Sequence, residues 1–415
     1  MGEYRGQPAS GALTERIAQH VEVLCGLKPD RSPGSSGNGA AVTYIEQVLA
    51  GLGLATESLP FTTYGWHAGA ASLETDGGAL DAHPGPYSPA FRGSGRLVAA
   101  RSLEEIARAK VADAIVLLHG PIAARQLTPR DYPWYSNPAH DDILDALEAA
   151  RPACVIAATG SDPDAAAGLA PFPLIEDASF DVPSAYLSEA CVPQLLASVG
   201  TDVTVLIESE RFIAECAQPL GRLAGWPGAP RVLVTSHLDT KHDTPGALDN
   251  ASGVAVMLGV AELLGQRGCT LNVDFVPFNG EDHFASPGEV AYLEAYPDLS
   301  DVRLVINVDG AGFAGGPTAV SRFETDAAVD TAVDAALAAR ARVVDGEPWF
   351  SGDHAVFVMR GIAALALTSH DMTSLWAEIP HTPADTPDRL DFELLAESAC
   401  FVVDVVRSLA PGHDR

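Results

Sequence analysis

The sequence has little that marks a secreted, membrane-spanning or thiolate-rich protein. No run approaches eighteen apolar residues, and the N-terminus lacks the basic-then-apolar pattern of a signal peptide. The six cysteines are scattered without a CxxC pair, and several lie in apolar stretches, which favours buried free thiols over disulfides or a thiolate metal site. We therefore expect a soluble cytoplasmic protein, although a secreted protein trimmed of its signal peptide would look the same.

Positive charge is also scarce. Lys and Arg number 25 against 55 Asp and Glu, which gives a formal net charge of −30. A field of that sign repels phosphate backbones and anionic membrane surfaces, so we expect neither nucleic acid nor a membrane as a partner. The same charge suits divalent cations, although composition alone does not locate a site for them.

The length of 415 residues exceeds the size at which one core stops growing, so we expect two domains. Residues 68–212 contain short strand-like runs among loops rich in Pro, Gly and Asp, without a cluster of potential ligands. We interpret 68–212 as an inserted β-rich domain. Residues 1–67 and 213–415 then form one discontinuous main domain.

From Arg231 onward, apolar strands alternate with helical stretches. The expected strands are RVLVTS, LNVDFVPF, RLVINV and IAALALTS, and the expected helices include GVAVMLGVAELLGQRG and ELLAESACFVVDVVRSLA. Strands that alternate with helices in this way indicate a mainly parallel sheet. The predicted fold class is therefore α/β, with a mixed, mainly parallel sheet flanked by helices and an inserted β-rich domain.

Polar side chains follow each of the four predicted strands. His237 and Asp239 follow the first, with Asp249 just before the next helix, and Glu281 and Asp282 follow the second. Ligands of such sheets bind outside the carboxyl ends of the strands. The third and fourth strands add two more residues there, Asp309 and, beyond a loop, His381. These side chains should meet at one edge of the sheet, and we interpret them as a site.

The residue types at this edge indicate a metal. Imidazole and carboxylate together suit zinc or another first-row divalent ion, and the absence of cysteine argues against a closed structural zinc site. Two histidines with three or four carboxylates are enough ligands for two ions that share one carboxylate. A water bridging two such ions would be strongly acidified, as hydrolases with two metals require.

Six motifs in this order (HLD, GALDNASGVA, NGED, NVDG, SGDHAVF and HTPADT) resemble the co-catalytic zinc aminopeptidases of peptidase clan MH. That group includes glutamate carboxypeptidase and, more distantly, glutaminyl cyclase. The resemblance covers about 31–65 and 217–410. It identifies the main domain as a metallopeptidase domain. The inserted segment resembles a protease-associated domain through VPSAYLSEACVPQLL and its general β character.

The resemblance implies a role for each site residue. His237 and Asp309 would hold one Zn²⁺, Asp282 and His381 would hold the other, and Asp249 would bridge them. Asp239 would accept the free ring N–H of His237 and fix its tautomer. Glu281 would be the general base, taking a proton from the bridging water and passing it to the leaving amine.

One position departs from the family pattern. The family usually has Glu where this chain has Asp282. Aspartate is one methylene shorter, so the second ion would lie nearer the strand or be held through a single oxygen.

Four further residues are candidates for the substrate pocket. Asp353 and His354 would contribute a hydrogen bond to the tetrahedral intermediate or serve the structure. Trp349 and Phe350 would line the pocket or pack in the core.

The function predicted from these motifs is hydrolysis of peptide or amide bonds, most simply by an aminopeptidase with two Zn²⁺ ions. The expected partner is a peptide or small amide substrate, and a homo-oligomer is possible. A carboxypeptidase, a dipeptidase or a specialised small-molecule amidohydrolase would have the same site, and a carboxypeptidase would need Arg342 or Arg360 to bind the substrate carboxylate. A further alternative is a single-zinc acyltransferase of the glutaminyl cyclase type.

Overall fold

The computed structural model describes residues 10–160, 172–370, 372–375 and 378–410. The chain divides into two compact units. Unit 1 comprises Met1–Phe61, Glu215–Leu375 and Ile379–Arg415, and unit 2 comprises Thr62–Ala214 and Trp376–Glu378. The sequence-based boundaries, at 67/68 and 212/213, stay a prediction. Two long strands, β1 (Ala55–Thr75) and β7 (Asp202–Leu223), have residues in both units.

Unit 1 contains a mixed sheet whose central strands are parallel. The strand order is β7-β9-β8-β10-β13-β11-β12. Strands β9, β8, β10 and β13 run parallel. Strand β7 pairs with β9, and β11 with β13, in antiparallel fashion, whereas β11 and β12 are parallel. The strand bounds are β8 Arg231–His237, β9 Asn272–Phe278, β10 Val302–Val308, β11 Thr318–Phe323, β12 Val343–Asp345 and β13 Ala364–Ser369. This arrangement confirms the predicted fold class.

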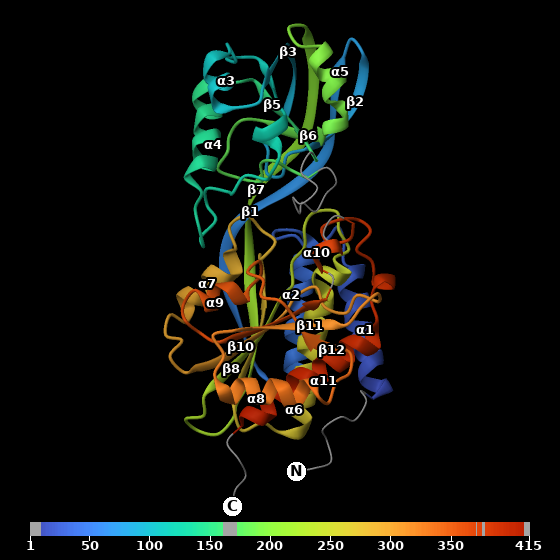
Figure 1. Cartoon of the computed structure of the whole chain (residues 1–415), viewed down its shortest axis with the longest axis vertical. Helices are drawn as coiled ribbons and strands as arrows, with labels where there is room; N and C mark the ends of the chain where they lie inside the picture. The colour runs from blue at the N-terminus through green and yellow to red at the C-terminus, as the bar shows by residue number, and fades with distance from the viewer. Residues whose placement is uncertain (1–9, 161–171, 371, 376–377, 411–415) are drawn as a thin grey trace, which may run out of the picture. The chain divides into compact units, whose positions relative to one another are not determined.

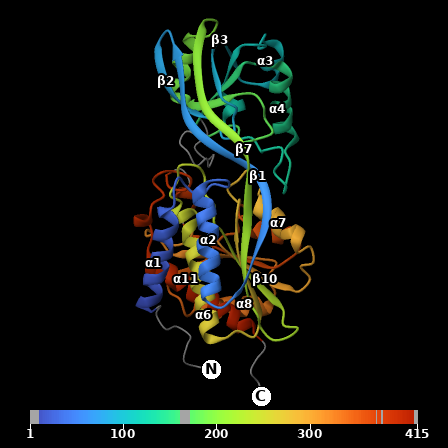
Figure 2. The same ribbon diagram turned by 180° about the vertical axis from the view of Figure 1, so that it is seen from behind.

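Helices cover both faces of this sheet. Helix α6 packs against β8, β9 and β10 and against α1, α2 and α11, while α9 packs against β10 and β13. In Figures 1 and 2, α7 lies across the sheet from α6 and α11, and Figure 1 shows α9 beside α7. The longer helices are α1 Gly11–Gly26, α2 Ser36–Gly51, α6 Ser252–Arg267, α8 Ala327–Leu337 and α11 Phe392–Leu409. The shorter elements are η3 Ala247–Ala251, α7 Pro287–Ala295, α9 His354–Val358, α10 Met372–Leu375 and η4 Pro387–Arg389.

The core of unit 1 lies between the sheet and these helices. Along β8 and β9 nearly every side chain is buried, because helices cover both faces, and this is why the strands read as continuous apolar runs. Helix α6 is buried over most of its circumference and ends at Gly268, which has a positive φ of 72°.

Unit 2 has a second parallel sheet. Strands β3 (Phe91–Ala100), β4 (Ile115–Leu118), β5 (Cys154–Thr159) and β6 (Ser184–Ser188) are parallel, and β2 (Gly78–Pro84) pairs with β6 in antiparallel fashion. These strands agree with the strand-like runs expected in 68–212. Between the strands, however, we expected only loops, and the structure has three α-helices there: α3 Leu103–Arg108, α4 Pro138–Ala150 and α5 Val192–Ala197. Two short helical turns complete the unit: η1 Gly120–Ala123 and η2 Glu189–Cys191.

Among the described residues, one helical stretch is long and apolar enough to cross a membrane by length and composition. This stretch is Ala247–Arg267, which comprises η3 and α6. Its most apolar 18 residues have a mean hydropathy of 1.4 and are entirely buried inside the protein. The core helix of a soluble protein passes the same test, so this stretch is weak evidence for a membrane span.

Candidate metal centre

The carboxyl edge of the parallel strands in unit 1 carries the predicted residues. His237 is the last residue of β8, and Asp309 directly follows β10. Glu281 and Asp282 follow β9 after a turn at Gly280, whose φ is 121°. Asp249 lies in η3, before α6, and His381 lies in the loop between α10 and η4. The loops that leave neighbouring strands therefore bring these side chains together, as expected for such sheets.

The Asp249 carboxylate lies between the two histidines. Its Oδ1 is 3.0 Å from Nε2 of His237, and its Oδ2 is 3.1 Å from Nε2 of His381. Each histidine has a second carboxylate beside it. Oδ1 of Asp309 is 3.4 Å from Nε2 of His237, and Oδ1 of Asp282 is 2.8 Å from Nε2 of His381. The cluster thus consists of two His–Asp pairs joined by one shared carboxylate.

The donor set and its burial fit divalent metal ions. One ligand atom each of His237, Asp249 and Asp282 lies within 4.8 Å of the others, and all three residues are buried. In addition, Nδ1 of His237 and Oδ2 of Asp282 are buried without a hydrogen-bond partner. Buried carboxylates crowded in this way repel one another unless positive charge lies among them. Imidazole nitrogen and carboxylate oxygen are the ligands that zinc and related ions take.

The electrostatics of the cluster favour a cation. Burial alone would lower the pKa of His381, but Asp282 and Asp249 outweigh it and raise that pKa to about 10. The pKa of His237 is likewise held well above its usual value, because Asp309, Asp239 and Asp249 outweigh the effect of burial. In the opposite direction, burial would raise the pKa of Asp249, but the two histidines bring it below the ordinary range.

Glu281 differs from the carboxylates of the cluster. Its side chain is 22% exposed, and its Oε2 is 4.0 Å from Nε2 of His237. Burial raises its pKa well above the usual value, His237 opposes that shift, and Asp309 and Asp282 add to it. By contrast, His381 brings the pKa of Asp282 below its usual value despite burial. The two adjacent acids therefore have opposite tendencies, and Glu281 is the one suited to take up a proton.

Asp239 makes contacts other than the predicted one. Its Oδ1 lies 3.6 Å from Nδ1 of His237, beyond hydrogen-bonding distance. Instead, Oδ1 accepts the backbone N–H groups of Gly280 (2.8 Å) and Glu281 (3.1 Å), and Oδ2 accepts that of Asp282 (3.2 Å). Asp239 therefore fixes the turn that presents Glu281 and Asp282.

Asp353 and His354 are completely buried, and both begin the short helix α9. Nε2 of His354 lies 2.8 Å from the carbonyl oxygen of Trp349, and its ring packs edge-on against the Trp349 ring. Burial lowers the pKa of His354 to about 4 and raises the pKa of Asp353 well above its usual value. Phe350 is 66% exposed and packs edge-on against Phe323. The predicted roles of these residues toward substrate stay predictions.

Two buried residues next to the cluster were missed. Asp385, four residues after His381 in HTPADT, accepts the backbone N–H groups of Leu248 and Asp249. Arg31, in the loop between α1 and α2, donates to backbone carbonyls on three segments. The signal for Asp385 was its place in a motif already singled out. Arg31 gave none, because its acceptors are main-chain atoms far away in the sequence.

Known proteins resemble this chain in fold, and part of the chain matches a family model. Residues 221–406 match the model of peptidase family M28. An aminopeptidase from Aneurinibacillus sp. strain AM-1 superposes with a TM-score of 0.74 at 22% identity, covering 96% of this chain and 94% of that one. BSAP, a zinc aminopeptidase from Bacillus subtilis, has a TM-score of 0.73 at 18% identity, covering 97% and 96%. At such identities these structures show a shared fold.

Curated relatives match over short segments only. The vacuolar membrane protease of Clavispora lusitaniae is 32% identical over 93 residues, which are 22% of this chain and 9% of that protein. The chain spans about a tenth of the length of the curated relatives it matches.

The segment that matches the family model is less than half of the chain, and it contains the buried group of His237, Asp249 and Asp282. Every candidate metal ligand named above, together with Glu281 and Asp239, lies within residues 221–406, which are similar to peptidase family M28.

Proposed function

We propose that this chain is an aminopeptidase that uses two divalent metal ions, most simply Zn²⁺. The observation that carries the proposal is the Asp249 carboxylate, one oxygen of which faces His237 and the other His381. A carboxylate placed in this way suits a ligand shared by two ions. His237 and Asp309 would complete one ligand set, and His381 and Asp282 the other.

The ions, when bound, would polarise the scissile carbonyl and lower the pKa of a water held at the site. Glu281 would accept a proton from that water as the water oxygen attacks the carbonyl carbon. When the C–N bond breaks, Glu281 would pass the same proton to the leaving amine. The position of Glu281 supports this role, since its Oε2 lies 4.0 Å from Nε2 of His237 and its side chain is 22% exposed, beside the proposed ligands but within reach of a substrate.

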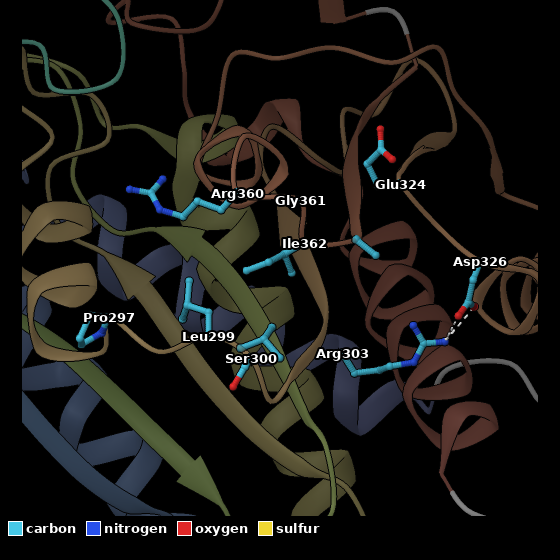
Figure 3. A pocket seen from close by; sticks show the side chains of 11 residues that line it. Pro297, Leu299, Ser300, Arg303, Glu324, Asp326, Arg360, Gly361 and Ile362 are labelled. Atoms are coloured by element: carbon cyan, nitrogen blue, oxygen red, sulfur yellow. Dashed lines mark hydrogen bonds and ion pairs between the residues drawn. The ribbon is translucent and has the colours of Figure 1, made fainter.

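The carboxypeptidase alternative has little support among the arginines named for it. Arg360 lines a pocket of about 720 Å³. Figure 3 shows it there, together with the ion pair of Arg303 and Asp326. Arg360 precedes β13, and Arg303 lies at the start of β10, so this pocket is at the amino edge of the sheet, opposite the cluster. Arg342 forms an ion pair with Asp391, the N-cap residue of α11. An aminopeptidase needs no such cation, and the fold shared with two structures titled aminopeptidases agrees with this choice.

Metal analysis combined with a substrate panel tests the proposal. We expect two equivalents of metal per chain and release of N-terminal residues from aminoacyl amides, with no cleavage once the α-amine is acylated. Cleavage of N-acyl amino acids that requires a free carboxylate would favour a carboxypeptidase instead. One metal per chain with cyclisation of N-terminal glutamine would point to the glutaminyl cyclase type of acyltransferase. A folded protein without metal would overturn the proposal.

A further inference from the structure

The segment 245–249 ends at Asp249, and the backbone of each of its five residues forms a hydrogen bond with Arg31 or Asp385. Its first two residues use their carbonyl oxygens: Nη1 of Arg31 donates to that of Pro245 (2.7 Å), and Nη2 donates to that of Gly246 (2.8 Å). Asp385 holds the other end. Its backbone carbonyl accepts the N–H of Ala247 (3.2 Å), and its carboxylate accepts those of Leu248 (2.6 Å) and Asp249 (3.0 Å). One arginine and one aspartate thus fix the path of the whole segment.

Arg31 is among the largest fully buried side chains, with 1% of its surface exposed. Besides its two bonds to the segment, Nε donates to the carbonyl of Leu238 (2.8 Å) and Nη1 to that of Leu24 (3.2 Å). Leu238 immediately precedes Asp239, whose carboxylate fixes the turn with Glu281 and Asp282. Burial of a guanidinium is costly unless its donors are satisfied, so the rigid fork of Arg31 must keep these carbonyls in place.

Gly246 shows how closely the segment is packed. Its φ is 60°, in the left-handed region that glycine tolerates best. A Cβ at this position would lie 2.9 Å from Nη2 of Arg31 and 2.7 Å from the carbonyl oxygen of Asp249. The nearest atom to such a Cβ would be Cγ2 of Thr240, closer than either of these, so the segment has no room for a side chain at position 246.

We infer that Arg31 and Asp385 form a clamp on residues 245–249 that positions Asp249 between the two histidines. The inference rests on the metal site proposed above. Neither residue faces the cluster as a ligand, so both are positioning residues. Asp385 also lies four residues after His381, and it therefore joins the loop that carries His381 to the segment that carries Asp249. The clamp would set the separation of the two His–Asp pairs.

The variant Asp385→Asn tests this inference. It keeps the shape of the side chain but replaces one acceptor oxygen by an NH₂ group, which then faces a backbone N–H. Residues that orient metal ligands typically change metal affinity 10–100-fold when they are substituted. We expect a loss of that size for Zn²⁺, measured by competition with a chelator of known affinity. The Co²⁺-substituted protein should also show an altered visible absorption spectrum, because the ligand geometry changes.

Asp177→Asn is the matched control. Asp177 in unit 2 is also buried, and it accepts the backbone N–H groups of Arg130 (3.0 Å) and Ser179 (2.8 Å). Both variants should lower the Tm, because each leaves a buried N–H without its acceptor. Only Asp385→Asn should weaken Zn²⁺ binding. Wild-type affinity and spectrum in a folded Asp385→Asn protein would overturn the inference, whereas wild-type protein that binds no metal would overturn the proposed function itself.

Arg31→Lys tests the clamp from its other end. Lysine keeps the charge but lacks the planar fork that reaches several carbonyls at once. We expect Zn²⁺ affinity to fall several-fold, with the CD spectrum unchanged. If Asp385→Asn does not fold, this variant decides the question, and an unchanged affinity would overturn the inference.

Discussion

Both units contain a parallel sheet, but the residues at the carboxyl edge of the sheet differ between them. Each has four adjacent parallel strands, so each has a carboxyl edge at which loops leave the sheet. In unit 1 those loops carry two histidines and four acids within a few ångströms of one another. The one group of three potential metal ligands found among the described residues also lies in unit 1.

The edge of unit 2 carries different residues. His119 follows β4 and Gly160 follows β5, and helix η1 begins one residue after His119. The difference teaches that a parallel sheet supplies a place for a site, whereas the residues directly after the strands decide whether chemistry occurs there.

The largest expected effect comes from the residue that joins the two halves of the cluster. We expect Asp249→Ala to lose both metal ions and all measurable peptidase activity, because each histidine would lose the shared carboxylate oxygen beside it. Metal content after gel filtration and the rate on an aminoacyl amide measure this. Two tightly held ions in the variant would mean that the shared ligand is another residue.

The same Glu→Gln substitution should have different effects in the two units. Glu281→Gln should keep both metals and the fold but lower kcat about 10²–10⁴-fold, because the amide cannot accept a proton. Glu176→Gln changes a buried acid of unit 2, which Gln126 contacts at 2.9 Å, and should leave kcat unchanged. Steady-state kinetics with metal analysis test the pair. Near-normal turnover of Glu281→Gln would remove this residue from the mechanism.

Strand ends were predictable from sequence because each apolar run stops where its polar residue begins. His237, Asp309 and the Glu281–Asp282 pair therefore lie at the predicted edge. The helices of unit 2 also had readable signals. Helix α4, for example, begins with an Asn137 cap and Pro138.

Side-chain partners across loops were not predictable. The spacing of His237 and Asp239 is typical of a carboxylate that contacts the ring, yet Asp239 accepts three backbone N–H groups of the loop after β9. That choice depends on the path of a loop some forty residues away in sequence. The role of Arg31 was not predictable for the same reason. Its acceptors are backbone carbonyl groups, which every residue has, so the sequence does not indicate which ones it contacts.

A smaller effect is expected at Asp282. Here the chain has a shorter acid than the family it resembles, yet Oδ1 reaches to 2.8 Å from Nε2 of His381, and the backbone N–H is held by Asp239. We expect Asp282→Ala to leave about one metal per chain, held by His237, Asp249 and Asp309. In wild-type protein, graded chelation should remove one ion well before the other, with activity falling at the first loss. Two ions and full activity in Asp282→Ala would make Asp282 a loop acid only.

The smallest expected effect concerns the stability of unit 1 away from the cluster. Burial lowers the pKa of His20 on α1 to about 4, and its Nδ1 lies 2.7 Å from the Tyr44 hydroxyl. The folded pKa is thus below the unfolded value of about 6.5, so the unfolded chain binds more protons between these two values. His20 therefore stabilises the fold fully above pH 6.5, and this contribution is lost as the pH falls toward 4.

His20→Gln should flatten that acid dependence, because glutamine can keep a hydrogen bond to Tyr44 and does not titrate. The contribution of His20 to the free energy of unfolding is expected to fall by about 1–2 kcal/mol between pH 7.5 and pH 5. For a unit of this size, each kcal/mol corresponds to roughly 2–4 °C in Tm. Calorimetric Tm values of both proteins at the two pH values measure it. His67→Gln, at an exposed histidine of β1 in unit 2, is the matched control and should follow the wild-type curve.

An acid dependence that is as steep in His20→Gln as in wild-type protein would assign the loss of stability to other groups. In that case the carboxylates and histidines of the cluster, which are concentrated in unit 1 alone, would be the next to test, by repeating the measurement with metal in excess.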